Sequence, residues 1–446
     1  MAKKTVQFVC TNCGATSSTW AGKCYNCGEW NTLQEQADIV VSSRQVQGKK
    51  LESQNIAAIR RKSPDKRIST AISEVDIVLG GGLVPGSVSL LAGQPGIGKS
   101  TLLLQLANAV AADQPVLYVS GEESASQVAI RAERLKCNNS KLDIASSAST
   151  DDIASTIAAG NYSLVIVDSI QTVSLKEIAS APGSVSQITN STHILSAAAK
   201  QTDTALLLVG HVTKEGSIAG PKILEHVVDV VLQLEGDRYG GFKVLRTVKN
   251  RYGSTNETGI FEMQDEGMSP VSNPSQALLA ERQVSDGSIV LATMEGSRPL
   301  LVEVQALVNK SSYGYPKRAA SGVDINRVNL LIAMLERRTK LNLADQDIYV
   351  NIVGGMRISE PAADLAICMA IASASKGMQL KQNVVVFGEV GLSGEIRHVP
   401  QIDKRLSEAK KLGFEGALGP AVKGKKLAGL YSCTNIRLAL NQFLER

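Results

Sequence analysis

A glycine-rich stretch near residue 95 has the composition of a phosphate-binding loop. Residues 93–101 read GQPGIGKST and fit the pattern GxxxxGK[ST]. The apolar run SVSLLAG at 87–93 predicts a strand before this loop, and LLLQLANAVAA predicts a helix after it. Glycines allow the loop to aim backbone amides at phosphate oxygens beside a helix N-terminus. We therefore expect nucleotide binding by Gly93, Gln94, Pro95, Gly96, Ile97, Gly98, Lys99, Ser100 and Thr101.

Three further apolar runs end in polar residues that could complete such a site. PVLYVSGEES (115–124) leads to Glu122 and Glu123, SLVIVDS (163–169) to Asp168, and TALLLVGHVTKEG (204–216) to His211. Ligands collect at the carboxyl edge of an open parallel sheet, so we expect these residues to lie beside the glycine-rich loop.

The chemistry of each side chain suggests its role. Lys99 is expected to contact the β- and γ-phosphates, and Ser100 and Asp168 to hold Mg²⁺. One of the two glutamates is expected to orient and deprotonate the attacking water. His211 could sense the γ-phosphate, although a lone histidine is often structural.

The N-terminal segment carries a second candidate site, for a metal ion. Its four thiols follow the spacing C-x2-C, ten residues, C-x2-C, which suits the tetrahedral ligand set of zinc. A single redox CxxC is the alternative. We expect Trp20, Tyr25 and Trp30 to form a small hydrophobic cap. The alternative is that they stack on nucleic-acid bases. The expected zinc ligands are Cys10, Cys13, Cys24 and Cys27.

The bulk composition excludes some classes of protein. The chain has 446 residues, enough for two sizeable domains and an appendage, and its formal charge of +5 permits a nucleic-acid partner without requiring one. It contains no run of 18 apolar residues and begins without an apolar signal region. The remaining cysteines are scattered. We therefore expect a cytoplasmic protein, in a reducing compartment, with neither membrane span nor disulfide framework.

Residues 1–270 resemble the RadA (Sms) family of bacterial ATPases, which are relatives of RecA and DnaB. The four-cysteine motif, the phosphate-binding loop and KNRYG at 249–253 carry the resemblance; the family's motif has phenylalanine where this chain has Tyr252. The resemblance implies a RecA-like ATPase core that uses ATP, with Glu122 rather than Glu123 as the catalytic carboxylate.

Two cations in the KNRYG motif raise the question of a shared site. Lys249 and Arg251 are two residues apart at an expected strand end, so both side chains would project to one face. The resemblance implies that a neighbouring subunit of a hexameric ring supplies them to the γ-phosphate, as an arginine finger does. It also implies RecA as a partner recombinase, and single-stranded DNA binding by the loops after the Asp168 and His211 strands. The cations of these loops are Lys176, Lys214 and Lys222.

Most of residues 285–435 resemble the Lon protease domain. The stretch EPAADLA places Ala362 where Lon has its nucleophilic serine, and Arg405 falls where Lon has its partner lysine. A serine–lysine dyad needs a hydroxyl and a deprotonatable amine, so we expect no proteolysis. A dyad shifted to Ser359 and Lys404 is the alternative. The basic stretch NKSSYGYPKRAASG offers further DNA-binding candidates, or only a solvated loop: Lys310, Tyr313, Lys317 and Arg318.

These observations predict an α/β protein made of several parts. We expect a zinc finger at 1–30, a linker at 31–65, a RecA-like ATPase domain with a mostly parallel sheet at 66–270, and a Lon-like α/β domain at 275–446. The leading functional hypothesis is a DNA-dependent, helicase-type ATPase that moves on single-stranded DNA and promotes branch migration in repair. The first alternative is an ATP-driven assembly switch. The second, which the Ala362 and Arg405 positions oppose, is an ATP-dependent protease.

Overall fold

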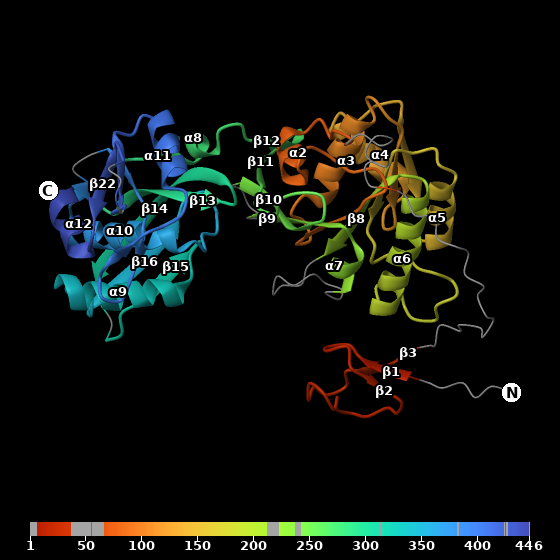
Figure 1. Cartoon of the computed structure of the whole chain (residues 1–446), viewed down its shortest axis with the longest axis horizontal. Helices are drawn as coiled ribbons and strands as arrows, with labels where there is room; N and C mark the ends of the chain where they lie inside the picture. Colours follow the sequence, from red (N-terminus) through yellow and green to blue (C-terminus); the bar gives the residue numbers. More distant parts are fainter. Residues whose placement is uncertain are drawn as a thin grey trace. The chain divides into compact units, whose positions relative to one another are not determined.

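The computed structural model in Figure 1 describes residues 7–36, 55, 67–211, 223–236, 242–312, 314–380, 383–422, 424 and 427–445. The chain divides into two compact units, Met1–Lys66 and Arg67–Arg446. In the described residues, no helix has the length and apolar character to span a bilayer.

The N-terminal unit is a small antiparallel ribbon. Its strands are β1 (Gln7–Cys10), β2 (Thr16–Ser17) and β3 (Leu33–Gln36), in the order β2-β1-β3. The buried side chains are Cys10, Cys24 and Leu33. The expected hydrophobic cap is wrong, because the ribbon is too thin to cover large rings. Trp20, Tyr25 and Trp30 are 61%, 71% and 68% exposed.

The second unit begins with a nine-stranded sheet in the order β12-β11-β10-β9-β4-β8-β7-β5-β6. Strands β4 to β9 are parallel, and β10 to β12 extend the sheet as antiparallel neighbours. The predicted mostly parallel sheet is therefore confirmed. The strands are β4 (Val88–Gly93), β5 (Val116–Ser120), β6 (Leu142–Ser146), β7 (Leu164–Asp168), β8 (Ala205–His211), β9 (Val230–Gly236), β10 (Phe242–Asn250), β11 (Thr258–Gln264) and β12 (Gly267–Pro270).

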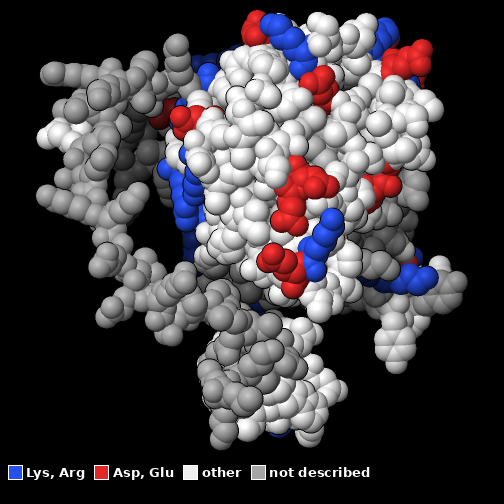
Figure 2. Space-filling model, turned by 90° about the vertical axis from the view of Figure 1, so that its right-hand side faces the viewer, with Lys and Arg blue, Asp and Glu red and all other residues white. Residues whose placement is uncertain are grey.

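Helices cover both faces of this sheet, as its continuous apolar strands require. Residues of α2 (Ser73–Leu79), α3 (Lys99–Val110) and α4 (Ala125–Arg134) share one buried cluster with alternate strand residues. Residues of α5 (Thr150–Ala158), α6 (Val185–Gln201) and α7 (Ile223–Val227) share the other. Figure 2 shows the side on which α5 lies, where the described charged side chains are scattered among uncharged ones.

The C-terminal part holds a seven-stranded sheet in the order β15-β16-β14-β13-β18-β21-β22. Every residue of helix α10 from Asp364 to Ser373 is buried, which is typical of a helix that is apolar all round. The sheet strands are β13 (Ser288–Glu295), β14 (Arg298–Lys310), β15 (Arg318–Ser321), β16 (Gln346–Ile352), β18 (Val384–Val386), β21 (Gly416–Pro420) and β22 (Leu430–Cys433). The helices are α8 (Pro274–Leu279), α9 (Ile325–Thr339), η1 (Pro361–Ala363), α10 (Asp364–Lys376), α11 (Ile402–Lys411) and α12 (Ile436–Phe443). Two short pairs complete it, β17 (Gln379–Leu380) with β23 (Leu444–Glu445) and β19 (Glu389–Val390) with β20 (Ile396–Arg397).

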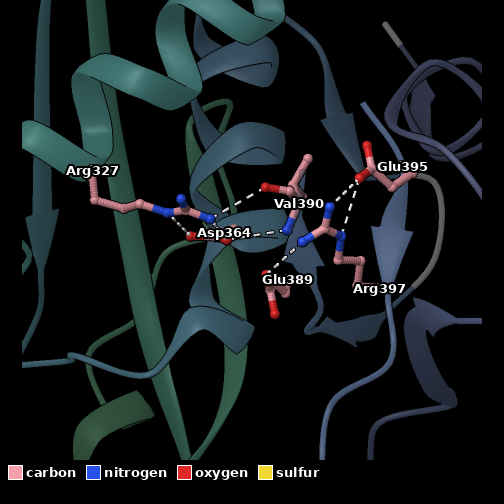
Figure 3. Close-up of polar contacts among 6 residues, drawn as sticks. All are labelled: Arg327, Asp364, Glu389, Val390, Glu395 and Arg397. Atoms are coloured by element: carbon pink, nitrogen blue, oxygen red, sulfur yellow. Dashed lines mark hydrogen bonds and ion pairs between the residues drawn. The ribbon is translucent and has the colours of Figure 1, made fainter. Parts of the chain in front are cut away.

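The buried carboxylate of Asp364, at the start of α10, is hydrogen-bonded to two neighbouring elements, α9 and β19. The guanidinium of Arg327, on α9, donates two hydrogen bonds to the carboxylate of Asp364, which also accepts from the Val390 amide at 3.1 Å (Figure 3). Asp364 is almost fully buried, so this pairing removes the cost of an isolated charge. On the same hairpin, Arg397 pairs with Glu389 and Glu395 at the surface.

A second buried pair lies where the protease resemblance placed a dyad. Arg405 is fully buried, and its guanidinium pairs with Glu360 and donates to the carbonyl of Ala292 at 2.6 Å. The Glu360 carboxylate also accepts from the Thr293 hydroxyl and the Met294 amide. Ala362 is buried and offers no nucleophile. In this structure Arg405 therefore joins α11 to the sheet.

Replacing Arg405 with leucine should lower local stability by about 3 kcal/mol, because Glu360 would keep a charge without its partner. Hydrogen exchange should show this as lost protection in peptides covering β13, β14 and α10. The matched control is Arg397→Leu, which breaks an exposed, solvent-screened pair and should cost far less. Equal losses in the two variants would contradict the structural role given to Arg405.

Candidate nucleotide site and zinc centre

The glycine-rich loop lies between β4 and α3, in the predicted strand–loop–helix context. Gly96 and Gly98 have φ of 78° and 111°, which favour glycine, and α3 begins at Lys99. A β-carbon on Gly98 would meet the methyl ends of Met263 and Met268. Gly93 ends β4, within the predicted strand, and it needs to be small because a β-carbon would lie 2.8 Å from the Leu234 carbonyl oxygen.

Lys99 is held over its own loop. Its Nζ donates to the carbonyls of Gly93 at 2.8 Å and Gln94 at 3.0 Å, and the side chain is almost fully buried. Burial lowers the pKa of Lys99 to about 8, while the negative charges of Asp168 and Glu122 act in the opposite direction. The ammonium group therefore lies where a bound phosphate could replace these carbonyls as its partner.

The two adjacent glutamates have different surroundings. The Glu122 carboxylate accepts a hydrogen bond from Ser169 Oγ at 2.9 Å and lies 3.8 Å from Nε2 of His211. The Glu123 carboxylate instead pairs with Arg131 of α4. Its backbone is also anchored, because its amide donates to Ser120 Oγ. Glu123 thus stabilises the segment that follows β5, whereas Glu122 lies near Lys99 of the glycine-rich loop.

Asp168 has a partner that the sequence analysis missed. The hydroxyl of Tyr118 donates to Asp168 Oδ2 at 2.6 Å. Burial and the charge of Asp168 raise the pKa of Tyr118 far above its ordinary range, so this hydroxyl keeps its proton. The sequence signal for this contact was a tyrosine within an apolar strand, since a buried tyrosine hydroxyl usually has a hydrogen-bond partner.

His211 lies beside Lys99 and Glu122 at the end of β8. Burial lowers its pKa, and the positive charge of Lys99 lowers it further, so the ring is neutral at neutral pH. Its Nδ1 is buried and has no hydrogen-bond partner within the described part of the chain. The structure therefore gathers Lys99, Glu122, Asp168 and His211 at one edge of the sheet.

Lys249 and Arg251 lie at the opposite edge. Asn250, between them, pairs with Val230 at the start of β9. Lys249 Nζ donates to the carbonyls of Glu225 and Val228, and Arg251 pairs with Asp229 at 2.9 Å. Asp229 in turn accepts from the amide of Val88, where β4 starts. At about 3.3 Å per residue, β4 separates these cations from their own glycine-rich loop by roughly 17 Å.

The DNA-binding candidates fall into two groups. Lys176 is exposed after β7, whereas Lys214 and Lys222 are outside the described residues, as is Tyr313. Lys310 ends β14 opposite Gln346, and Arg318 begins β15 opposite Ile348, so both lie near one end of β16, on the two strands that flank it. Lys317 precedes Arg318 there.

The four N-terminal thiols form a site that fits zinc. Their sulfur atoms all lie within 4.8 Å of one another. Cys10 and Cys27 are 3.6 Å apart, as are Cys13 and Cys24. Tetrahedral zinc–thiolate bonds of about 2.3 Å require a sulfur–sulfur separation of roughly 3.8 Å. Gly14 and Gly28, which follow the two CxxC pairs, have φ of 74° and 76°, a backbone conformation that favours glycine.

Cys24→Ser should reduce the bound zinc from one ion per chain to near zero, because three thiolates and a hydroxyl bind zinc far more weakly. Metal analysis of the purified full-length protein measures this directly. Cys433→Ser, at a buried cysteine of the C-terminal part, is the control and should keep the zinc. Undiminished zinc in Cys24→Ser would contradict the assignment.

Three segments of the chain match family models. Residues 8–35 match a rubredoxin metal binding domain, residues 56–217 an AAA domain, and residues 316–423 the subunit ChlI of Mg-chelatase. The chain therefore has a four-cysteine zinc-binding ribbon, a P-loop ATPase domain and a ChlI/Lon-like C-terminal region.

Relatives match nearly the whole chain. "DNA repair protein RadA" of Bacillus subtilis (strain 168) is 48% identical over 431 residues, which cover 94% of this chain and 93% of the relative. The proteins of the same name from Pseudomonas aeruginosa and Aquifex aeolicus are 46% and 44% identical, and the matches cover 100% and 99% of both chains. The chain belongs to the RadA family of DNA repair proteins.

Proposed function

We propose that this protein is a DNA-dependent ATPase that moves along single-stranded DNA and promotes branch migration of recombination intermediates during repair. The observation that carries the ATPase part is the meeting of Glu122, Asp168 and His211 with Lys99 at one sheet edge. The DNA part rests on membership of a family whose named relatives are DNA repair proteins. On this proposal it works in the cytoplasm, with a RecA-type recombinase as partner.

The residues at the edge fit ATP and Mg²⁺. The hydroxyl of Ser100 and the carboxylate of Asp168 are the hard oxygen donors that Mg²⁺ prefers. Bound there, Mg²⁺ would neutralise charge on the phosphates. Lys99 binds the β- and γ-phosphates, and Glu122 orients the attacking water and accepts its proton. Neutral His211 contacts the γ-phosphate and reports its presence to the segment that follows β8.

A neighbouring copy completes this site. Lys249 and Arg251 lie at the far edge of the sheet, so in one chain they are remote from the phosphates. A head-to-tail ring of identical chains, a hexamer by the family resemblance, brings them to the next subunit's γ-phosphate. There they stabilise transition-state charge only while the neighbour is docked.

The segments after β7 and β8 and the C-terminal part bind DNA, and the C-terminal part also supports the ring. Lys176, Lys214 and Lys222 contact the strand from the loops after β7 and β8, and Lys310, Lys317 and Arg318 add a second basic surface. The domains are those expected above, 1–30, 31–65, 66–270 and 275–446, except that β3 (Leu33–Gln36) pairs with β1 and so belongs to the zinc-binding ribbon and not to the linker. The last is a scaffold and not a protease, because the positions of the dyad hold Ala362 and a buried, ion-paired Arg405.

Single-stranded DNA should stimulate ATP hydrolysis by the purified protein, and the stimulation should fade as salt rises, since DNA binding releases counterions. Turnover in the presence and absence of DNA across a salt series measures this. ATP turnover that is indifferent to DNA would contradict the motor and favour the second candidate, an ATP-driven assembly switch, which needs only the nucleotide site and the neighbour's cations.

A further inference from the structure

The hydroxyl of Tyr118 contacts one of the side chains that are proposed to hold Mg²⁺. It donates to Asp168 Oδ2 at 2.6 Å. Asp168 ends β7, and Tyr118 lies on the neighbouring strand β5. One phenol group therefore connects the middle of one strand with the end of the next.

The ring that carries this hydroxyl is held firmly. Tyr118 lies in the middle of β5, is 1% exposed, and belongs to the buried cluster that includes residues of α3 and α4. It pairs with Ile166 of β7, two residues before Asp168. Diagonal neighbours of this kind are within reach of an aromatic side chain. The hydroxyl is therefore fixed by the core and not by the loop.

A fixed hydroxyl at this point restricts a mobile group. A carboxylate rotates freely when nothing holds it, and a cation must then order it at an entropic cost. A hydrogen bond to Oδ2 orients the carboxylate of Asp168 and leaves lone pairs for a metal ion. Hydrogen-bond partners that orient metal ligands in this way typically change metal affinity by about 10–100-fold when removed.

We propose that Tyr118 is a positioning residue that presets the orientation of the Asp168 carboxylate, and so determines how strongly Mg²⁺ tightens nucleotide binding. It acts through Asp168 and is not itself a ligand or a catalytic group. The inference rests on the proposed nucleotide site. It says that the buried Tyr118 hydroxyl sets how much bound Mg²⁺ increases the affinity for nucleotide.

The test compares full-length wild-type protein with Tyr118→Phe, which keeps the ring in the core and removes only the hydroxyl. Binding of a fluorescent ADP derivative is measured in EDTA and then across a Mg²⁺ titration. Affinity in EDTA should stay within about twofold, since Lys99 and the loop amides are unchanged. The Mg²⁺ concentration for half-maximal tightening should rise about 10–100-fold, and excess Mg²⁺ should restore binding.

Tyr162→Phe is the matched control. The hydroxyl of Tyr162 also donates to an aspartate, Asp143 Oδ2 at 2.7 Å, but near the amino end of β6 and thus at the other edge of the sheet. This variant should leave the Mg²⁺ titration unchanged.

The possible outcomes separate the two claims. If Mg²⁺ does not tighten nucleotide binding by the wild type, the proposed Mg²⁺–nucleotide site fails and this inference with it. If the wild type responds and Tyr118→Phe responds identically, the site stands and the inference is overturned, whatever the change in melting temperature. The inference would also be overturned if Tyr162→Phe raised the half-maximal Mg²⁺ concentration as much as Tyr118→Phe does.

Discussion

The parallel pairing of β4, β8, β7 and β5 is the constraint on which the rest of the site depends. Its register places His211 opposite Gly93 and Asp168 opposite Ser120. Because the strands run in one direction, the segments that follow them leave the sheet at the same edge. Each side chain there has a fixed origin in the buried sheet, and the polar contacts among them, such as Ser169 with Glu122, refine an arrangement that the backbone pairing has already made.

The same sheet places a second set of cations out of reach of its own nucleotide site. Strand β10 runs against β9, so Lys249 and Arg251 emerge at the amino edge of the parallel strands. Their contacts there, with Asp229 and the carbonyls before it, hold them in place. A chain with complementary groups at opposite edges is suited to heterologous association, in which each copy completes the site of the next.

Local patterns predicted much of this protein, and contacts between distant segments account for what they missed. The cysteine spacing and the strand–loop–helix context around Lys99 depend on neighbouring residues, so both could be predicted from the sequence. Which of the two adjacent glutamates forms an ion pair with α4 depends on Arg131, nearly two turns into that helix. The partner of Asp168 lies fifty residues away on another strand. The exposure of Trp20 and Trp30 depends on how thin the folded ribbon is, which composition does not reveal.

The most direct test of the account is to mix two inactive proteins. Glu122→Gln keeps the cations and Arg251→Ala keeps the proposed catalytic carboxylate, so each alone should turn over ATP poorly. In mixed rings, some sites pair the intact Glu122 of one protein with the intact Arg251 of the other, about a quarter of interfaces for random mixing in equal amounts. The account predicts that ATP turnover of the mixture rises well above the mean of the two variants. Turnover equal to that mean, in rings shown to contain both proteins, would contradict a site shared between neighbouring copies.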